Sequence, residues 1–245
     1  MASTIQRLFL IRHATSTANL DATIYKTVPD HVIPLARPED DPRALEAAEM
    51  LRPFRLPVDD TCCWSSTYVR CRQTEALMTG PLFGAETERL RRRVSFLLRE
   101  QEFGDWDGLD DEECARLFPA QWAKRQRMSD AQGRFYFRVP NGESRADVVQ
   151  RSSILLGKIH RSRYHNHLIF LHGVTQRALR MAWFDRLPEW FETEPNPTNT
   201  SVLLIDRDEQ GRWQERYLFR LLFACTIGPC DLESLRCSWR ACSGG

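Results

Sequence analysis

Two short apolar runs, each ending in a histidine, constrain the fold of this chain most strongly. Residues 8–11 are followed by Arg12 and His13, and residues 168–171 are followed by His172. Apolar runs of this length, bounded by polar residues, are typical of buried strands in a parallel sheet. In an open α/β sheet, ligands bind at the carboxyl edge of the strands. We therefore expect both imidazoles to lie at that edge.

Between these runs, strand patterns and helix patterns alternate along the chain. The expected strands cover residues 7–12, 62–64, 86–90, 167–171, 201–205 and 213–218, and the expected helices cover residues 44–54, 68–78, pieces of 110–127, 144–159 and 174–184. Such alternation is typical of a parallel sheet covered by helices on both faces. We therefore predict the α/β class, as a three-layer α/β/α sandwich with a mainly parallel central sheet.

A length of 245 residues is sufficient for one large α/β domain with a substantial core. We expect this domain to cover residues 1–220. The charged and aromatic segment 91–143 interrupts the alternation, and we expect it to form a cap-like insertion over the active site. Residues 221–245 contain Gly228-Pro229 and end in Ser-Gly-Gly, which is typical of a C-terminal extension outside the main fold. The sequence indicates no role for this extension.

The charge balance gives no support for nucleic acid or a membrane as a partner. The net charge is +1, and no apolar run approaches the roughly 18 residues that a membrane span needs. No secretory signal pattern precedes the first strand. We therefore expect a cytoplasmic location, where the eight cysteines are buried or free thiols. Cys225, Cys230, Cys237 and Cys242 lack the paired C-x2-C spacing of zinc sites, so we expect no metal there.

The first histidine block is suited to nucleophilic chemistry on phosphate. A guanidinium beside an imidazole disfavours the charged form of the histidine, so Arg12 favours a neutral His13. A neutral imidazole is the nucleophilic form, and an arginine can bind a phosphoryl oxygen. Ser16 and Asn19 follow closely and could donate further hydrogen bonds to the phosphate. The alternative for both is a capping role at a helix or turn.

Two later blocks add an arginine and a carboxylate to this set. Ser65 and Ser66 are expected to cap a helix in which Arg70 lies about one turn from the start and reaches back to the sheet edge. Glu100 lies in an acidic stretch, and a carboxylic acid beside a bound phosphate can protonate a departing alkoxide. We expect His172 to be protonated and to stabilise charge on the transferring group.

In their order along the chain, these blocks resemble the histidine phosphatase superfamily, also called phosphoglycerate mutase-like. The family's opening R-H-G with a downstream S and N is similar to Arg12-His13-Ala14, Ser16 and Asn19. Its later motifs are similar to Ser66, Arg70, Gln73 and Thr74, to Leu98, Glu100, Phe103, Gly104, Trp106 and Gly108, and to His172-Gly173. Segments at Tyr25, Pro29-Asp30-His31 and residues 133–144 resemble a plant and fungal branch of broad-range phosphatase-like proteins. The resemblance covers about residues 7 to 219.

The resemblance implies a role for each matching residue. His13 is the nucleophile that forms a phosphohistidine, and Arg12, Arg70 and His172 surround the phosphoryl group. Glu100 donates a proton to the leaving oxygen and later activates water. Glu102 is a competitor for this role, although the position of the F-G pair favours Glu100. The resemblance implies no metal, because positive side chains replace the cation, and we expect no cofactor.

The resemblance leaves the reaction open between two kinds of enzyme. Phosphoglycerate mutases carry Arg-His-Tyr after the catalytic glutamate and a paired arginine clamp for a carboxylate, whereas this chain has Gln101-Glu102-Phe103. We therefore expect a metal-independent phosphatase acting on small phosphomonoesters, with mutase-type phosphoryl transfer as the alternative. A non-catalytic phospholigand-binding protein is a second alternative. The expected partner is a small phosphorylated metabolite, and a homo-oligomer is left open.

Two positions depart from the family pattern. Ala14 stands where the family usually has glycine, which places a methyl group beside the nucleophile. Residues 38–41, Pro-Glu-Asp-Asp, replace the usual L-T-x-x-G lead-in to the next helix, so the course of that loop is left open.

Overall fold

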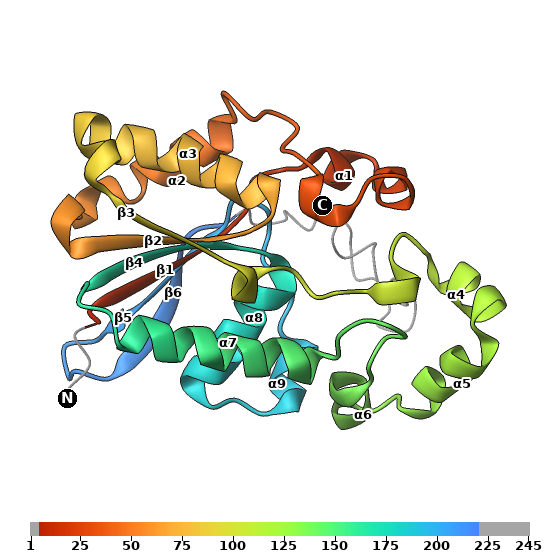
Figure 1. Cartoon of the computed structure of the whole chain (residues 1–245). Coiled ribbons are helices and arrows are strands. Elements are labelled where there is room, and N and C mark those ends of the chain that lie inside the picture. The colour runs from red at the N-terminus through yellow and green to blue at the C-terminus, as the bar shows by residue number, and fades with distance from the viewer. Residues whose placement is uncertain (1–4, 221–245) are drawn as a thin grey trace, which may run out of the picture.

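The computed structural model describes residues 5–220, and a six-stranded sheet lies at its centre (Figure 1). The strands are β1 (Arg7–Arg12), β2 (Thr61–Ser66), β3 (Arg91–Ser95), β4 (Asn166–Leu171), β5 (Val202–Arg207) and β6 (Trp213–Phe219). Their order is β3-β2-β4-β1-β5-β6. The first four strands in this order are mutually parallel, while β5 and β6 are antiparallel to their neighbours. The predicted α/β class with a mainly parallel sheet is confirmed.

Helices cover both faces of the sheet. They are α2 (Pro42–Glu49), α3 (Val69–Phe83), α7 (Arg145–His160), α8 (Gly173–Phe184) and α9 (Pro188–Thr193). Helices α2 and α3 lie on one face, and α7, α8 and α9 lie on the other (Figure 1). Alternate side chains of each strand point to opposite faces, so Phe9 and Phe170 join the core under α2 and α3, and Leu10 and Ile169 join the core under α7 and α8.

The third strand lies later in the chain than the sequence predicts. Residues 86–90 were expected to be a strand, but η5 (Gly84–Arg89) is a 3-10 helix and β3 begins at Arg91. Strand β3 lies at the edge of the sheet, and four of its five side chains are exposed. Because three exposed arginines occupy this edge strand, it contains no apolar run. The pattern that predicts buried strands is therefore absent from β3.

The loop at residues 38–41 ends in a helix cap. The Asp41 carboxylate accepts hydrogen bonds from the backbone N–H groups of Arg43 and Ala44 at 3.0 and 2.9 Å, and Pro42 is the first residue of α2. An aspartate at the cap followed by proline is a strong helix start. The helix ends earlier than predicted, at Glu49, and a 3-10 turn, η3 (Arg52–Phe54), follows.

A group of short helices lies beyond the sheet edge at which β1 and β4 end (Figure 1). This cap contains η7 (Gly104–Trp106), α4 (Asp111–Leu117), α5 (Pro119–Arg127) and α6 (Ala131–Tyr136). Trp106, Cys114, Phe137 and Val139 form its own small core. The insertion expected at residues 91–143 thus includes β3, which belongs to the sheet, and its later part forms the cap.

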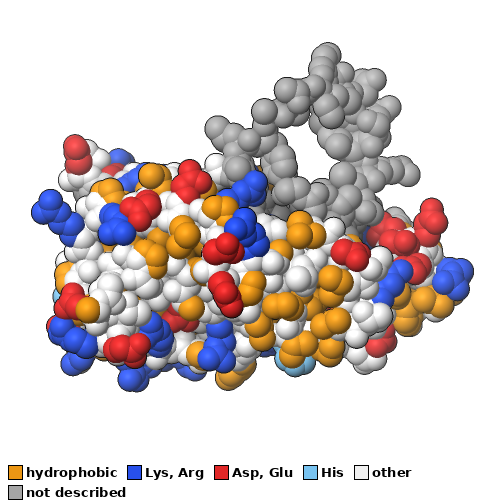
Figure 2. Space-filling model, turned by 90° about the horizontal axis from the view of Figure 1, so that it is seen from above, with side chains coloured by type: hydrophobic (Ala, Val, Ile, Leu, Met, Phe, Trp, Pro, Cys, Tyr) orange, Lys and Arg blue, Asp and Glu red, His pale blue; other side chains and the backbone are white. Residues whose placement is uncertain are grey.

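The surface agrees with the nearly neutral composition. On the face that carries α2 and α3, acidic and basic side chains are interspersed (Figure 2). Within residues 5–220, no helix is both long and apolar enough to cross a membrane. Cys62, Cys63, Cys71 and Cys114 are buried. The expected extension at residues 221–245, with its four cysteines, lies outside the described residues.

A close backbone contact joins the start of the cap to its end. Gly104 has a φ of +51°, and a Cβ atom there would lie 2.1 Å from the carbonyl oxygen of Pro140. Across the same contact, the backbone N–H of Glu143 donates to the carbonyl of Glu102 at 2.8 Å. Gly104 is therefore required both by its left-handed backbone and by the lack of space for a side chain.

Gly104→Ala is expected to destabilise the protein by about 2 kcal/mol or more, because it combines left-handed strain with a backbone clash. Gly80→Ala is the matched control, since Gly80 lies in α3 and its added Cβ would meet nothing within 4 Å. This control should be neutral or stabilise by up to about 1 kcal/mol. Urea unfolding of both variants measures the difference. Equal stability of the two variants would contradict the tight contact.

Candidate active site

Parallel pairing of β1 with β4 brings the two histidines together. Arg12 is directly opposite Leu171 in the register, so His13 and His172 are the next residues at the same edge. The backbone N–H of His13 donates to the carbonyl of Leu171 at 3.0 Å. The two imidazole rings lie with their centroids 5.2 Å apart. The sheet edge thus holds two adjacent buried imidazoles.

The hydrogen bonds of His13 determine which of its nitrogens carries the proton. Its Nδ1 lies 2.7 Å from the carbonyl oxygen of Ala14, which can only accept, so Nδ1 is the donor. Arg70 Nε can only donate, and it lies 3.2 Å from His13 Nε2. Nε2 therefore keeps its lone pair. Burial first, and then the charges of Arg70 and Arg12, hold the pKa of His13 well below its ordinary value of 6.5.

Arg70 reaches the site from the second position of α3, directly after β2. Its guanidinium is buried and also binds Asp30, a residue of the 3-10 helix η2 (Asp30–Val32). Arg70 Nη1 donates to the Asp30 carboxylate at 2.8 Å and to its backbone carbonyl at 2.6 Å. Asp30 thereby fixes the arginine that contacts His13.

Arg12 is held from the opposite side of the site. Its Nη1 donates to the backbone carbonyl of Pro197, and its Nε has no hydrogen-bond partner within residues 5–220. A Cβ atom on Gly173 would lie 3.7 Å from Arg12 Cζ, so the helix start packs against the guanidinium. Arg12 is buried and lines the cavity. A guanidinium fixed by one nitrogen can bind an oxyanion with the others.

His172 is fully buried and is the N-cap residue of α8. Its Nε2 lies 3.0 Å from Ser66 Oγ and 3.4 Å from Cys71 Sγ. Burial first, and then Arg70, His13 and Arg12, hold the pKa of His172 well below 6.5. The expectation of a protonated His172 is therefore wrong for this arrangement, because the charged form would be desolvated beside two arginines.

The two serines before Arg70 do not cap the following helix. Ser65 and Ser66 belong to β2, and Tyr68 is the N-cap residue of α3, without a side-chain cap bond. Because the strand continues through both serines, Ser66 contacts His172 instead. The expectation of a serine cap is wrong, and it missed a contact within the site.

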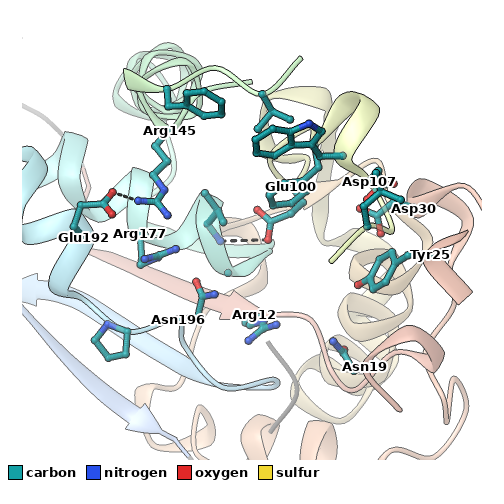
Figure 3. Close-up of a pocket in the computed structure, with 18 of the residues that line it drawn as sticks. Arg12, Asn19, Tyr25, Asp30, Glu100, Asp107, Arg145, Arg177, Glu192 and Asn196 are labelled. Atoms are coloured by element: carbon teal, nitrogen blue, oxygen red, sulfur yellow. Dashed lines mark hydrogen bonds and ion pairs between the residues drawn. The ribbon is translucent and has the colours of Figure 1, made fainter. Parts of the chain in front are cut away.

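Glu100 lies at the N-terminus of α8, and in Figure 3 it stands between Arg177 and Asp107. Its carboxylate accepts the backbone N–H groups of Val174 and Thr175, each at 3.2 Å, and that of Gln101 at 3.0 Å. A helix N-terminus stabilises a nearby carboxylate. Glu100 lines the cavity, whereas the Glu102 side chain is exposed and does not.

Ser16 and Asn19 bond to each other at the short helix α1 (Thr17–Leu20). Ser16 is its N-cap residue, and its Oγ lies 2.9 Å from Asn19 Oδ1 in a capping box. Asn199 Nδ2 also donates to Asn19 Oδ1 at 2.8 Å and holds the carbonyl oxygen of His13 at 3.3 Å. Asn19 lines the cavity and Ser16 lies behind it. Both side chains thus support the loop that follows His13.

These groups open into one cavity of about 360 Å³. Of the side chains expected from the sequence, Arg12, His13, Asn19, Arg70 and Glu100 line it. The structure adds Tyr25, Asp30, Asp107, Arg145, Arg177, Glu192 and Asn196, among others, and aromatic side chains of the cap (Figure 3). Arg145 and Arg177 lie on one side of Glu100, and Asp107 and Asp30 lie on the other (Figure 3).

Sequence reasoning missed the two arginines of this wall. Arg177 follows His172 by five residues on a helix whose first nine residues are all buried, and a buried arginine there signals a specific contact. Arg145 directly follows the N-cap residue Ser144, which gives no such signal. In the part of the chain that the structure describes, no group of three or more His, Cys, Asp or Glu side chains is placed to hold a metal ion.

The sheet, the paired histidines and the two buried arginines define an α/β/α protein with an arginine-lined cavity at the carboxyl edge of its parallel strands. The chain belongs to the histidine phosphatase superfamily (branch 1), whose family model matches residues 8–219. The resemblance found in the sequence is thereby confirmed. Members of this superfamily are phosphatases or mutases.

Two curated relatives are similar to this chain in sequence. The chain is 32% identical over 227 residues to a phosphoglycerate mutase-like protein of Arabidopsis thaliana, a match that covers 84% of the chain and 66% of the relative. It is 30% identical over 132 residues to a broad-range acid phosphatase of Saccharomyces cerevisiae, covering 50% of the chain and 35% of that protein. The chain thus matches just under two thirds of the first relative's length and about one third of the second's.

Solved structures share the fold. A mycobacterial glucosyl-3-phosphoglycerate phosphatase matches with a TM-score of 0.64 at 25% identity, over 86% of this chain and 98% of that one. The YhfR protein of Bacillus stearothermophilus matches with a TM-score of 0.64 at 22% identity, over 86% of this chain and 95% of that one. The second likeness concerns the fold alone.

The bonds of His13 predict an imidazole that stays neutral in mildly acidic solution. A histidine of ordinary pKa is half protonated near pH 6.5, whereas His13 should keep its neutral Nδ1–H tautomer well below that pH, because burial and the charges of Arg70 and Arg12 lower its pKa. Nitrogen NMR of the imidazole rings measures this, with His13→Gln used to assign the signal. A His13 signal that titrates near pH 6.5 would contradict the hydrogen-bond pattern.

Proposed function

We propose that the protein is a metal-independent phosphatase that hydrolyses small phosphomonoesters through a phosphohistidine on His13. The single observation that carries this proposal is the pair of hydrogen bonds made by the His13 ring. Nδ1 donates to the carbonyl oxygen of Ala14, and Nε2 keeps its lone pair and accepts from Arg70. A neutral imidazole fixed by its second nitrogen is an activated nucleophile. Arg12 and Arg70 supply two positive charges beside it, where the phosphoryl oxygens would lie.

In the first step, His13 Nε2 attacks phosphorus and forms the N–P bond while the P–O bond to the leaving group breaks. The departing oxygen takes a proton from the carboxylic acid of Glu100, which becomes a carboxylate. The lone pair of His13 Nε2 is used in the new N–P bond. The Nε–H of Arg70 therefore donates its hydrogen bond to a phosphoryl oxygen instead of to His13. The backbone N–H groups at the start of α8 stabilise the carboxylate that forms.

In the second step, Glu100 takes a proton from water as the water oxygen attacks phosphorus. The N–P bond breaks, inorganic phosphate leaves, and His13 and Glu100 return to their starting forms. His172 acts as a neutral neighbour of the phosphoryl group, oriented by Ser66 Oγ. The two arginines carry the charge that the sequence assigned partly to His172.

The residues after Glu100 favour water over a rebound hydroxyl as the acceptor. Gln101 is buried, and its Nε2 donates to the Glu143 carbonyl at 2.8 Å, while the Glu102 side chain is exposed. Neither side chain lines the cavity. The names of the yeast and mycobacterial relatives, both phosphatases, point in the same direction.

The size of the cavity and the cap beside it support a small phosphorylated metabolite as the substrate. The cavity volume of about 360 Å³ lies at the lower end of the range for small-molecule sites. Trp106 and Phe137 of the cap line it, so the organic part of the substrate would contact aromatic rings.

The roles of His13 and Glu100 predict a dependence on the leaving group. His13→Ala should abolish phosphate release from both 4-nitrophenyl phosphate and glycerol phosphate. Glu100→Gln should lower kcat about 10²- to 10⁴-fold for glycerol phosphate, whose alkoxide needs a proton, and much less for 4-nitrophenyl phosphate. Glu102→Gln is the matched control and should leave both rates unchanged. Acid-labile phosphorylation of the wild-type protein, absent in His13→Ala, tests the intermediate.

Different results in these assays would favour a mutase or a non-catalytic binding protein. Isomerisation of phosphoglycerate primed with 2,3-bisphosphoglycerate, without net phosphate release, would show a mutase. Tight binding of phosphorylated ligands without turnover, unchanged in His13→Ala, would show a binding protein. An equal loss of rate for both leaving groups in Glu100→Gln would contradict its role as proton donor.

A further inference from the structure

Strand β3 is an edge strand that carries three consecutive arginines. In the described residues 5–220 it pairs with β2 alone, so the backbone N–H and C=O groups along its other side have no partner strand. Its sequence is Arg-Arg-Arg-Val-Ser, and the first four side chains are exposed. None of these residues lines the cavity. This edge is therefore a surface that the proposed reaction does not use.

The pairing with β2 divides these side chains between the two faces of the sheet. Arg91 and Arg93 pair with β2 residues that belong to the core under α7 and α8. Because side chains alternate along a strand, Arg92 and Val94 point to the face that carries α3. The open backbone of β3 is thus flanked by two arginines on one face, and by an arginine and a valine on the other.

Among these arginines, the one on the α3 face is paired with a carboxylate. Arg92 Nε lies 3.1 Å from the Glu75 carboxylate of α3. Within residues 5–220, neither Arg91 nor Arg93 forms an ion pair with a carboxylate. The guanidinium of Arg93 lies over the Trp64 ring, 5.1 Å from its centroid, and this contact holds it beside the edge. Two positive charges on one face of β3 are therefore available to a ligand.

These charges disfavour pairing of β3 with a second copy of itself. In an antiparallel register centred on Arg92 or on Arg93, that residue would lie directly opposite its own copy. Like charges opposite one another destabilise a pair of strands. A strand with carboxylates at alternate positions would instead place one carboxylate opposite Arg91 and one opposite Arg93. Charge complementarity therefore favours an acidic partner strand.

Two exposed apolar side chains lie beside the arginines. Val94 is 54% exposed, and Phe96, directly after the strand, is 62% exposed. Charged side chains alone would protect an edge strand against pairing. Exposed apolar side chains have the opposite effect, because their burial under another strand is favourable. A partner strand that fits this edge would therefore have an apolar residue next to its carboxylates.

We propose that β3 binds an extended acidic segment of a partner protein, which adds to the edge of the sheet as a further strand. Main-chain hydrogen bonds to the open side of β3 provide affinity, as in other cases of strand addition. Carboxylates two residues apart contact Arg91 and Arg93, and an apolar residue contacts Val94. This binding does not depend on the reaction at His13.

Two peptides of identical composition test the position of the carboxylates. Ser-Val-Glu-Thr-Glu-Val-Ser places both carboxylates on one face of an extended strand, and its symmetric sequence matches β3 in either orientation. In Ser-Val-Thr-Glu-Glu-Val-Ser, the carboxylates point to opposite faces. Fluorescence anisotropy with the full chain should show that the first peptide binds about tenfold more tightly. Hydrogen exchange of residues 91–95 should slow in that complex, because strand addition protects backbone N–H groups.

A charge reversal separates specific pairing from a general attraction of anions. Arg91→Glu with Arg93→Glu should lose binding of the acidic peptide and bind Ser-Val-Lys-Thr-Lys-Val-Ser instead. Arg43→Glu with Arg52→Glu is the matched control, because it changes the net charge equally at exposed positions in and after α2. This control should keep the preference for the acidic peptide. Circular dichroism and thermal unfolding show whether both double variants fold like the wild-type protein.

Several results would overturn the inference. Equal binding of the two acidic peptides would show that the alternation of β3 is not recognised. Unchanged hydrogen exchange in residues 91–95 would show that the backbone of the edge takes no part. A single-stranded oligonucleotide that binds as tightly as the first peptide would show a general attraction of anions. If neither peptide binds, the arginines only protect the edge against pairing.

Discussion

The parallel pairing of β1 with β4 is the contact on which the site depends. One strand comes from the start of the chain and the other from residue 166 onward, and their register places His13 beside His172. A shift of one residue would turn every side chain of a strand to the opposite face. Because both faces of these strands are buried, such a shift would exchange side chains between the two cores and would no longer place His13 beside His172. The register of this one strand pair therefore sets the position of the two imidazoles.

Much of this arrangement could be predicted from the sequence, because the signals are local. The apolar runs predicted β1 and β4, and Ser144 with its following periodicity predicted α7. Where several signals of this kind agree, the fold class is determined. The order of four motifs indicated the family, which the comparison with residues 8–219 confirmed. Glu100 could be distinguished from Glu102 by its motif position, and the structure turns these two side chains to opposite environments.

The remaining features depend on contacts between distant segments, which no local pattern encodes. Arg70 meets Asp30 across 40 positions, and Glu100 meets Val174 across 74. The charge state of His172 follows from burial beside two arginines, and a histidine at a strand end does not reveal how deeply it is buried. Strand β3 was misplaced for the converse reason, because its sheet pairing is satisfied although its side chains face solvent.

The meeting of Gly104 with Pro140 has a further consequence for how this architecture can change. The segment between Gly104 and Pro140 leaves the α/β/α sandwich and returns to it at nearly the same point. The arrangement of the sheet therefore does not constrain the length or the sequence of this segment. Lengthening such an excursion costs only a slowly growing closure entropy. Insertions, deletions or exchange of the cap would therefore change the shape of the cavity, while the sheet edge that carries His13 and His172 remains in place. Substrate preference and the proposed phosphoryl transfer can therefore change independently of each other.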